Sequence, residues 1–332
     1  MLGNYEGNPE ARIICDEIVK RLGRFGRRHQ LGQALARHLF PHKLLLMSLP
    51  IFLAFLGFSQ EQRISPRFHF DHGAIIRGDT ARKELALVFT GHEFSDGGCV
   101  IRDVLRKSNI RAGFFFTGDF YRQAGHAQLI SDLLQDGHYL GPHSDKHLLY
   151  CSWEDRNRLL VSKPEFAADL IDNYKAMSRL GIEKKDPLLF IPPYEWYNET
   201  IAAWSKELGL TLFNFTPGTS SNADYTTPDM PNYLTSEEIF RSILDYEKKD
   251  PHGLNGFLLL IHIGTHPDRK DKFYLRLDDL IEHLRRRGYA FRRIDELLAP
   301  VPNGLDRQDK NLVQDKKEIF SRDNDDSGRS PG

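Results

Sequence analysis

The chain has 332 residues, 40% of them hydrophobic and 11% aromatic, which suits one large catalytic domain with extensions. Its 45 basic and 46 acidic residues leave a net charge of -1, so no global field attracts nucleic acid or anionic membranes. The three cysteines show no CxxC or other zinc-type spacing and offer no disulfide framework. Ligand recognition must therefore come from a local site.

The N-terminal region matches an export signal that follows an unusually long extension. Lys43 precedes an apolar run of about 15 residues ending at Phe58, shorter than the roughly 20 residues that span a bilayer. A basic flank, an apolar core and small residues after it are typical of a secretory signal peptide, and a buried core helix is the alternative. We expect an N-terminal extension over 1–59 with the signal peptide at about 43–59, and a true start downstream of Met1. The protein would then be periplasmic or extracellular, with no stable membrane span after cleavage.

The other end of the chain has the composition of a disordered tail. Residues 302–332 are dominated by Asp, Lys, Arg, Asn and Gly, and such a segment cannot bury enough apolar surface to offset the entropy of ordering. The catalytic domain is therefore expected over 67–300.

Within that domain, short apolar runs alternate with amphipathic stretches. Helices are expected at about 100–105, 129–137, 163–180, 198–208, from 236 onward, and at 275–287. Strands are expected at 85–89, 112–116, 138–141, 188–191, 211–215, 256–261 and 289–291. This alternation implies parallel strands joined by helical crossovers. We predict an α/β fold, a distorted (β/α) barrel of about seven parallel strands, with an open doubly wound sheet as the alternative.

Polar residues with catalytic chemistry follow these strands directly, where either architecture would place its site. His143 and His147 are four residues apart after the third strand, and a helical turn there would direct both imidazoles to one face. Two histidines and one carboxylate are a common catalytic zinc set that leaves a position for water, which the metal makes acidic. The alternative is that one histidine caps a helix and the other is exposed.

These segments resemble the motifs of the polysaccharide deacetylase family, with its NodB-homology domain (carbohydrate esterase family 4-like), from about Glu84 to Leu298. The motif H-[ST]-x-x-H is met by residues 143–147 and L-x-H by 260–262, whereas R-x-P-[YF] is met by 191–194 with isoleucine replacing the arginine. The resemblance implies that His143 and His147 bind a metal and that His262 is the acid that protonates the leaving amine. It also implies that the backbone amide of Tyr194 stabilises the oxyanion.

The first family motif, T-F-D-D, is replaced by Thr90-Gly91-His92-Glu93. Aligned without a gap, Glu93 becomes the third metal ligand and His92 the general base, a role that a neutral imidazole can fill. In the rival alignment Glu93 is the base and Asp96 binds the metal. The missing arginine is compatible with an imidazole base, because two cations side by side are unfavourable. The fourth motif supplies an aspartate that orients the acid, and Asp224 is its candidate.

The resemblance implies metal-dependent hydrolysis of the N-acetyl group of an amino sugar in an oligo- or polysaccharide, releasing acetate. The metal would be Zn²⁺ by default, with Co²⁺ or Ni²⁺ as alternatives. The partner would be an N-acetylated glycan, contacted at the substrate site by Pro193, Tyr194, Glu195 and Trp196. Trp196 and Tyr197 either stack on a sugar or belong to the core, and Trp153 and Trp204 are predicted core residues. Two other functions stay open: another metal amidohydrolase of this fold acting on a non-sugar C–N bond, and a catalytically impaired carbohydrate-binding relative.

Overall fold

The computed structural model describes residues 68–184 and 188–299. The expected signal peptide at 43–59, the extension around it and the tail at 302–332 lie outside these residues, so those expectations stay predictions. Among the described residues, no helix combines the length and apolar character needed to cross a membrane.

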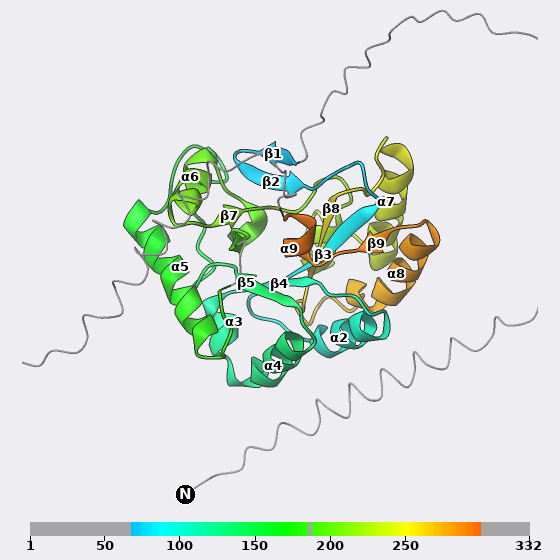
Figure 1. Cartoon of the computed structure of the whole chain (residues 1–332), viewed down its shortest axis with the longest axis horizontal. Coiled ribbons are helices and arrows are strands. Elements are labelled where there is room, and N and C mark those ends of the chain that lie inside the picture. Colours follow the sequence, from blue (N-terminus) through cyan, green and yellow to red (C-terminus); the bar gives the residue numbers. More distant parts are fainter. Residues whose placement is uncertain (1–67, 185–187, 300–332) are drawn as a thin grey trace, which may run out of the picture. The chain divides into compact units, whose positions relative to one another are not determined.

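The centre of the domain is a parallel five-stranded sheet (Figure 1). Its middle strand, β3 (Glu84–Gly91), lies between β4 (Gly113–Phe116) and β8 (Phe257–His262). Next to β4 lies β5 (Tyr139–Pro142), and the short β9 (Ala290–Phe291) pairs with the first residues of β3. Every residue of β3 from Leu85 to Gly91 is buried. The strand is therefore covered on both faces, as its unbroken apolar run predicted.

A second parallel pair, β6 (Leu189–Phe190) and β7 (Thr211–Leu212), forms a separate two-stranded sheet. It meets β5 through one side chain, because the Tyr139 hydroxyl accepts a hydrogen bond from the Leu189 N–H at 2.9 Å. Beyond β7, the Thr216 N–H donates to the Leu258 carbonyl of β8 at 3.0 Å. The predicted α/β fold with parallel strands is confirmed. The strands that the structure describes form a five-stranded sheet and a two-stranded one, joined by such single contacts and not by a continuous ladder.

An antiparallel hairpin covers the end of the domain beside β7. Its strands are β1 (His69–Asp71) and β2 (Ala74–Arg77), and Ile75 of β2 forms a parallel bridge with Phe213. The hairpin was not predicted, because its strands are short and β1 is largely exposed, so the segment lacks a clear alternation of apolar and polar residues.

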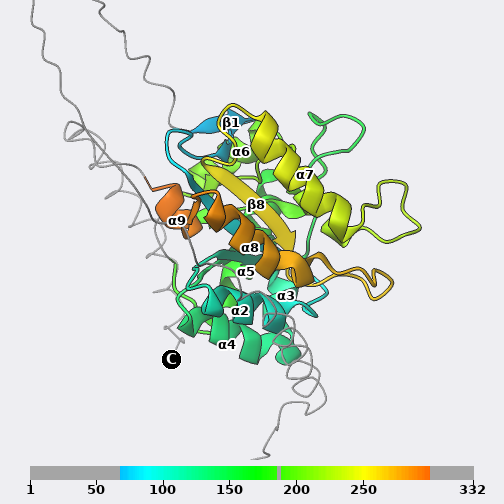
Figure 2. The ribbon, with the colours of Figure 1, turned by 90° about the vertical axis from the view of Figure 1, so that its right-hand side faces the viewer.

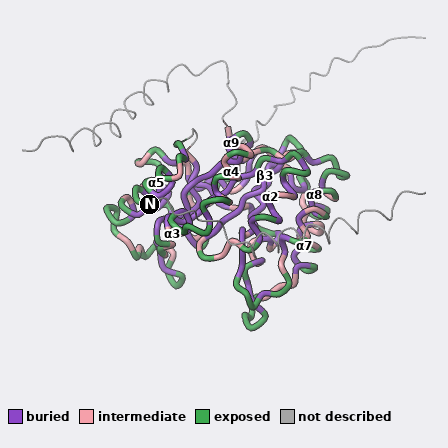
Figure 3. Tube along the Cα trace, turned by 90° about the horizontal axis from the view of Figure 1, so that it is seen from below, coloured by how far each residue is buried: buried purple, intermediate pink, exposed green. Residues whose placement is uncertain are grey.

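The helices surround the sheet, and α7 and α8 run alongside β8 (Figure 2). Exposed residues gather on their outer sides, whereas the strands are buried (Figure 3). Two capping boxes fix helix starts, at Ser162 with Glu165 and at Thr235 with Glu238, and the predicted N-cap Asn198 accepts from the Ile201 N–H at 3.0 Å. The helices are α2 (Gly98–Lys107), α3 (Gly118–Arg122), α4 (Ala127–Gln135), α5 (Lys163–Ser178), α6 (Glu199–Glu207), α7 (Ser236–Lys249), α8 (Leu277–Arg286) and α9 (Ile294–Leu297).

Candidate active site

His143 lies directly after β5 and is held in the form that binds a metal. Its backbone N–H donates to Asn173 Oδ1 on α5 at 2.9 Å, and its ring Nδ1 lies 2.9 Å from the Ile191 carbonyl. Because a carbonyl can only accept, Nδ1 carries the proton and Nε2 keeps its lone pair. The residue is 2% exposed, and burial lowers its pKa to about 3. The imidazole is therefore neutral at physiological pH.

His147 reaches His143 through an irregular loop, not through the helical turn considered from the spacing. Ser144 and His147 both have left-handed backbone conformations, with φ of 72° and 56°, so no helix can continue through them. The two rings nevertheless come together, with centroids 5.1 Å apart. Burial, followed by the neighbouring histidines, lowers the pKa of His147. The two histidines of the motif therefore lie close together, and both are neutral.

Asp145, between the two histidines in sequence, anchors this loop. Its carboxylate accepts hydrogen bonds from both terminal nitrogens of Arg122, at 2.6 and 2.9 Å. Its own backbone N–H donates to Asp169 Oδ1 on α5 at 3.1 Å. Such a two-point pairing of guanidinium and carboxylate fixes orientation as well as distance. The loop conformation that brings His147 to His143 is therefore fixed from α3 and α5.

His92, after β3, joins the pair, whereas Glu93 does not. The His92 ring stacks on His147 with centroids 4.7 Å apart and planes at 9°, and its Nδ1 lies 3.1 Å from Thr117 Oγ1. The Glu93 side chain is 65% exposed, with Oε1 4.0 Å from His92 Nε2. Within the described ranges, no group of three or more His, Cys, Asp or Glu side chains is arranged to hold a metal ion. The structure thus brings three imidazoles together and directs Glu93 mostly to solvent.

Asp96, the alternative metal ligand, is already bound by three other groups. Its Oδ1 accepts from the Thr265 N–H at 2.8 Å, while Oδ2 accepts from the Tyr274 hydroxyl at 2.8 Å and lies 3.0 Å from Lys272 Nζ. These bonds tie the loop after β3 to the segment after β8. A metal at Asp96 would compete with all three of them.

His262, at the end of β8, is paired with Asp224 from the 3₁₀ turn η3 (Ser221–Tyr225). Its Nδ1 lies 2.6 Å from Asp224 Oδ1, and its backbone N–H donates to Oδ2 at 2.9 Å. Burial acts to lower the pKa of His262, but the charge and hydrogen bond of Asp224 outweigh it, so the pKa is raised. Asp224, the candidate for the fourth motif, therefore contacts the predicted acid.

Tyr194 and Glu195 lie opposite this pair in the turn η2 (Pro193–Glu195) after β6. Both have left-handed backbones, with φ of 58° and 52°, a conformation that costs non-glycine residues about 1–3 kcal/mol each and is often found at functional sites. Asn214 holds the turn by donating to the Glu195 carbonyl at 2.8 Å. Burial raises the pKa of the Glu195 carboxyl to about 7, against an opposing effect of His262. Glu195 is thus close enough to His262 for their charges to interact.

The burial of the tryptophans differs in part from the prediction. Trp153 was expected in the core, but it is 56% exposed, so that prediction was wrong. Its polar neighbours Ser152, Glu154 and Asp155 are typical of an exposed loop and could have indicated this exposure. Trp196 is half-buried, whereas Tyr197 is fully buried and belongs to the core. Trp204 packs at the edge of the core beside Phe166, as predicted.

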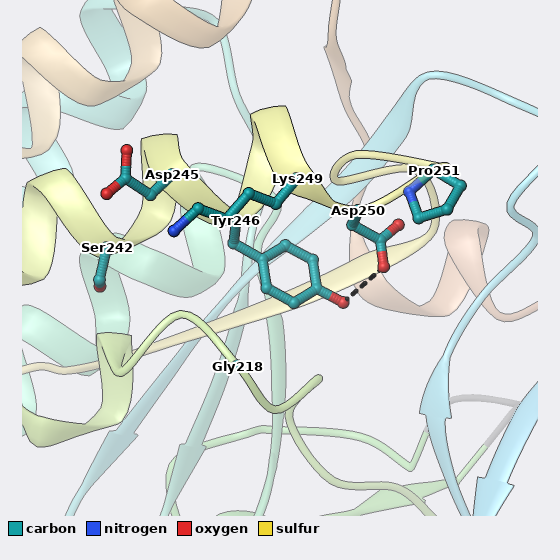
Figure 4. A pocket seen from close by; sticks show the side chains of 7 residues that line it. All are labelled: Gly218, Ser242, Asp245, Tyr246, Lys249, Asp250 and Pro251. Atoms are coloured by element: carbon teal, nitrogen blue, oxygen red, sulfur yellow. Dashed lines mark hydrogen bonds between the residues drawn. The ribbon is translucent and has the colours of Figure 1, made fainter.

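A hollow on α7 lies apart from these residues. Among the side chains that line it are Ser242, Asp245, Tyr246 and Lys249, and the Tyr246 hydroxyl donates to Asp250 at 3.1 Å (Figure 4). None of its lining residues belongs to the histidine cluster or to the turn η2. The hollow is therefore separate from the residues that the sequence predicted for catalysis.

Comparisons with known proteins identify relatives of this chain. The sequence model of the family described as Polysaccharide deacetylase matches residues 78–213, a range that includes His92, His143, His147 and Tyr194 and ends before Asp224 and His262. The peptidoglycan-N-acetylmuramic acid deacetylase PdaA of Bacillus subtilis is 24% identical over 68% of this chain and 76% of its own length. The peptidoglycan-N-acetylglucosamine deacetylase of Bacillus cereus is 24% identical over 60% of this chain and 80% of its own.

Among solved structures, BA3943 of Bacillus anthracis, a CE4 family pseudoenzyme, has the same fold. It superposes with a TM-score of 0.54 at 16% identity, covering 69% of this chain and 70% of that one. Residues 78–213 therefore match the polysaccharide deacetylase family, and the curated relatives of this chain include peptidoglycan deacetylases, which are hydrolases acting on carbon–nitrogen bonds.

Proposed function

We propose that this protein is a metal-dependent deacetylase that hydrolyses the N-acetyl group of an amino sugar in a glycan and releases acetate. The observation that carries the proposal is the meeting of a neutral histidine pair, His143 and His147, with the acid pair formed by His262 and Asp224. The charge of His262 influences the pKa of both motif histidines. The two halves of the site are thus within electrostatic reach of one another.

The donor set suits a borderline-soft divalent cation such as Zn²⁺, with Co²⁺ or Ni²⁺ as alternatives. His143 offers a free Nε2 fixed by the Ile191 carbonyl, which is the arrangement that metal-binding imidazoles usually have. When bound, the metal would polarise the acetamide carbonyl and acidify water. The third protein ligand would come from His92 or Glu93, which are neighbours in the chain at the end of β3.

The chain's own residues then divide the remaining work. Whichever of His92 and Glu93 does not bind the metal accepts the proton of the attacking water as general base. The His92 ring is positioned for this role, with Nδ1 3.1 Å from Thr117 Oγ1. The backbone N–H of Tyr194, set by the left-handed turn, stabilises the developing oxyanion. His262 carries its mobile proton on Nε2, because Nδ1 is engaged by Asp224, and donates it to the sugar nitrogen as the C–N bond breaks.

Metal binding can be tested without any substrate. Zinc titrated calorimetrically into chelator-treated protein should bind at one site. His143→Ala should weaken this binding by more than about tenfold, because loss of a residue that only supports a ligand already costs roughly that much. His252→Ala, which removes an exposed histidine, is the matched control. Comparing His92→Ala with Glu93→Ala identifies the third ligand. Equal zinc affinity in His143→Ala and His252→Ala would contradict the proposed metal site.

The substrate class is tested by the product released. Acetate release from an N-acetylated glycan supports the deacetylase, whereas ammonia release from a small amide would indicate a different amidohydrolase of this fold. Glycan binding without any product would indicate a catalytically impaired relative. A glycan substrate also fits the proposed export, and N-terminal sequencing of the native protein tests whether 1–59 is removed.

A further inference from the structure

Three aromatic side chains next to the histidine cluster contact one another in a row, which we call the aromatic platform: the exposed Tyr194 and Trp153 and the half-buried Trp196. Tyr194 meets Trp153 edge-on with ring centroids 5.8 Å apart, and Trp153 stacks on Trp196 at 5.2 Å with planes at 29°. Tyr194 and Trp153 are 45% and 56% exposed. Exposed tryptophan beside further exposed aromatic surface is uncommon, and such a patch usually marks a binding site.

The platform is rigid beneath its exposed surface. The Trp196 indole N–H donates to the Ser152 carbonyl at 3.1 Å, which ties it to the loop that carries Trp153. The Arg156 guanidinium lies 4.3 Å from the Trp196 ring centroid and donates to the Tyr197 carbonyl at 2.6 Å. A cation near an aromatic ring in this way is attracted to its electron-rich face. Trp196 is therefore held in place before any ligand arrives and offers Trp153 a fixed surface to stack on, so less ordering entropy is lost on binding.

The platform is continuous with the catalytic residues. Tyr194 packs against His147 with ring centroids 4.3 Å apart, so Tyr194 separates the histidines from Trp153. An acetamide that reacts at the histidines must belong to a sugar beside Tyr194. Trp153 is one ring further from the histidines than Tyr194, where the neighbouring sugar of the same chain would lie.

We propose that the aromatic platform, and Trp153 in particular, binds the pyranose ring adjacent to the one that is deacetylated. The C–H groups on one face of a pyranose carry partial positive charge and suit the electron-rich face of an indole. The flat, uncharged surface of Trp153 fits such a face better than it fits a phosphate or a peptide. This proposal rests on the proposed function for the reacting sugar, but binding at the platform is measurable without turnover.

The test measures binding by intrinsic tryptophan fluorescence and its quenching by acrylamide. The probes are N-acetylglucosamine, its β-1,4-linked hexamer and muramidase-digested peptidoglycan. An oligomer should protect the wild-type protein from acrylamide, whereas the monosaccharide should protect it far less. Trp153→Ala should raise the Kd for the oligomer by about tenfold, the size expected for one aromatic contact. Trp153→Phe keeps an aromatic face and should recover most of the affinity, which a purely structural role would not predict.

Phe70→Ala is the matched control, because it removes an exposed aromatic side chain of β1 outside the platform. An unchanged Kd in Trp153→Ala, or no protection of the wild type by either oligomeric probe, would overturn the platform. Acetate release is measured separately on the same samples. Protection that depends on Trp153 without acetate release would support the platform and contradict the deacetylase. Acetate release that is unchanged in Trp153→Ala would support the deacetylase and contradict the platform.

Discussion

Asp224 holds His262 at two points, through the ring Nδ1 at 2.6 Å and through the backbone N–H at 2.9 Å. The carboxylate is 1% exposed and accepts both bonds at the end of β8. This pairing fixes the tautomer of the imidazole and leaves Nε2 as its outward nitrogen. An acid held in this way can deliver its proton in one direction, which is what protonation of a leaving amine requires.

Asp224→Asn should lower kcat for acetate release by about a hundredfold or more, the size of a general-acid contribution. The Asp224 charge raises the pKa of His262 against the effect of burial, and the acid acts in its protonated form. Removing the charge lowers this pKa, so the alkaline limb of the kcat profile should move to lower pH. Asp245→Asn on α7 is the control. An unmoved alkaline limb in Asp224→Asn would contradict the assigned role.

Glu195→Gln should give a smaller shift of the same limb to lower pH. The Glu195 charge also raises the pKa of His262, but less than Asp224 does. The same substitution should stabilise the fold near pH 8. Because burial raises the pKa of Glu195 to about 7, the folded state loses stability as pH rises from the ordinary carboxyl pKa through that value. Urea unfolding at pH 5 and pH 8 should show a gain of about 1–2 kcal/mol at the higher pH only; equal gains at both would refute the explanation.

Gly118→Ala should damage the metal-binding loop without altering a histidine. A Cβ at Gly118 would overlap Asp145 Oδ1 and approach Arg122 Nη1 at 2.9 Å, so the carboxylate would be displaced from its guanidinium. We expect a loss of about 1–3 kcal/mol in stability, typical of overpacking, together with weaker zinc binding by calorimetry. Gly125→Ala is the control, since a Cβ there meets nothing within 4 Å. Similar behaviour of the two variants would show that the Asp145 anchor is dispensable.

His138 should make the fold acid-sensitive for reasons unrelated to catalysis. The side chain is buried at 1% exposure, its Nδ1 accepts from the Ala112 N–H at 3.0 Å, and burial lowers its pKa to about 4. Below the ordinary histidine pKa, His138 is protonated in the unfolded chain but stays neutral in the folded state. The free energy of unfolding therefore falls between about pH 6.5 and pH 4. His138→Asn keeps an acceptor without titrating. Between pH 7.5 and pH 5 it should lose about 1–2 kcal/mol less than wild type in urea unfolding.

The sequence predicted those parts of the fold whose pattern is local. The buried strands at 85–89 and 256–261 and the N-cap Asn198 appear within a few residues of their predicted positions, because apolar runs and capping residues act over short distances. The hairpin β1–β2 and the short helices α3 and α9 escaped prediction. They are too short to show a periodic pattern, and tertiary contacts stabilise them.

In the candidate site, too, the sequence predicted the features that depend on local spacing and missed those that depend on tertiary contacts. The spacing of His143 and His147 indicated their meeting, although left-handed residues achieve it where a helical turn was considered. Asp224 and His262 are 38 residues apart in sequence, and no local sequence pattern predicts a contact between two such residues. The direction of the Glu93 side chain and the exposure of Trp153 depend on loop conformation, which residue type alone does not determine.

Acetate release from an N-acetylated glycan oligomer, assayed with chelator-treated protein before and after zinc is restored, tests whether this protein is a metal-dependent deacetylase. We expect zinc to restore equal amounts of free acetate and free amine, and His262→Ala with zinc bound to release neither. Zinc-loaded wild-type protein that binds the oligomer and yet releases no acetate would contradict the proposed function. So would full activity in His262→Ala.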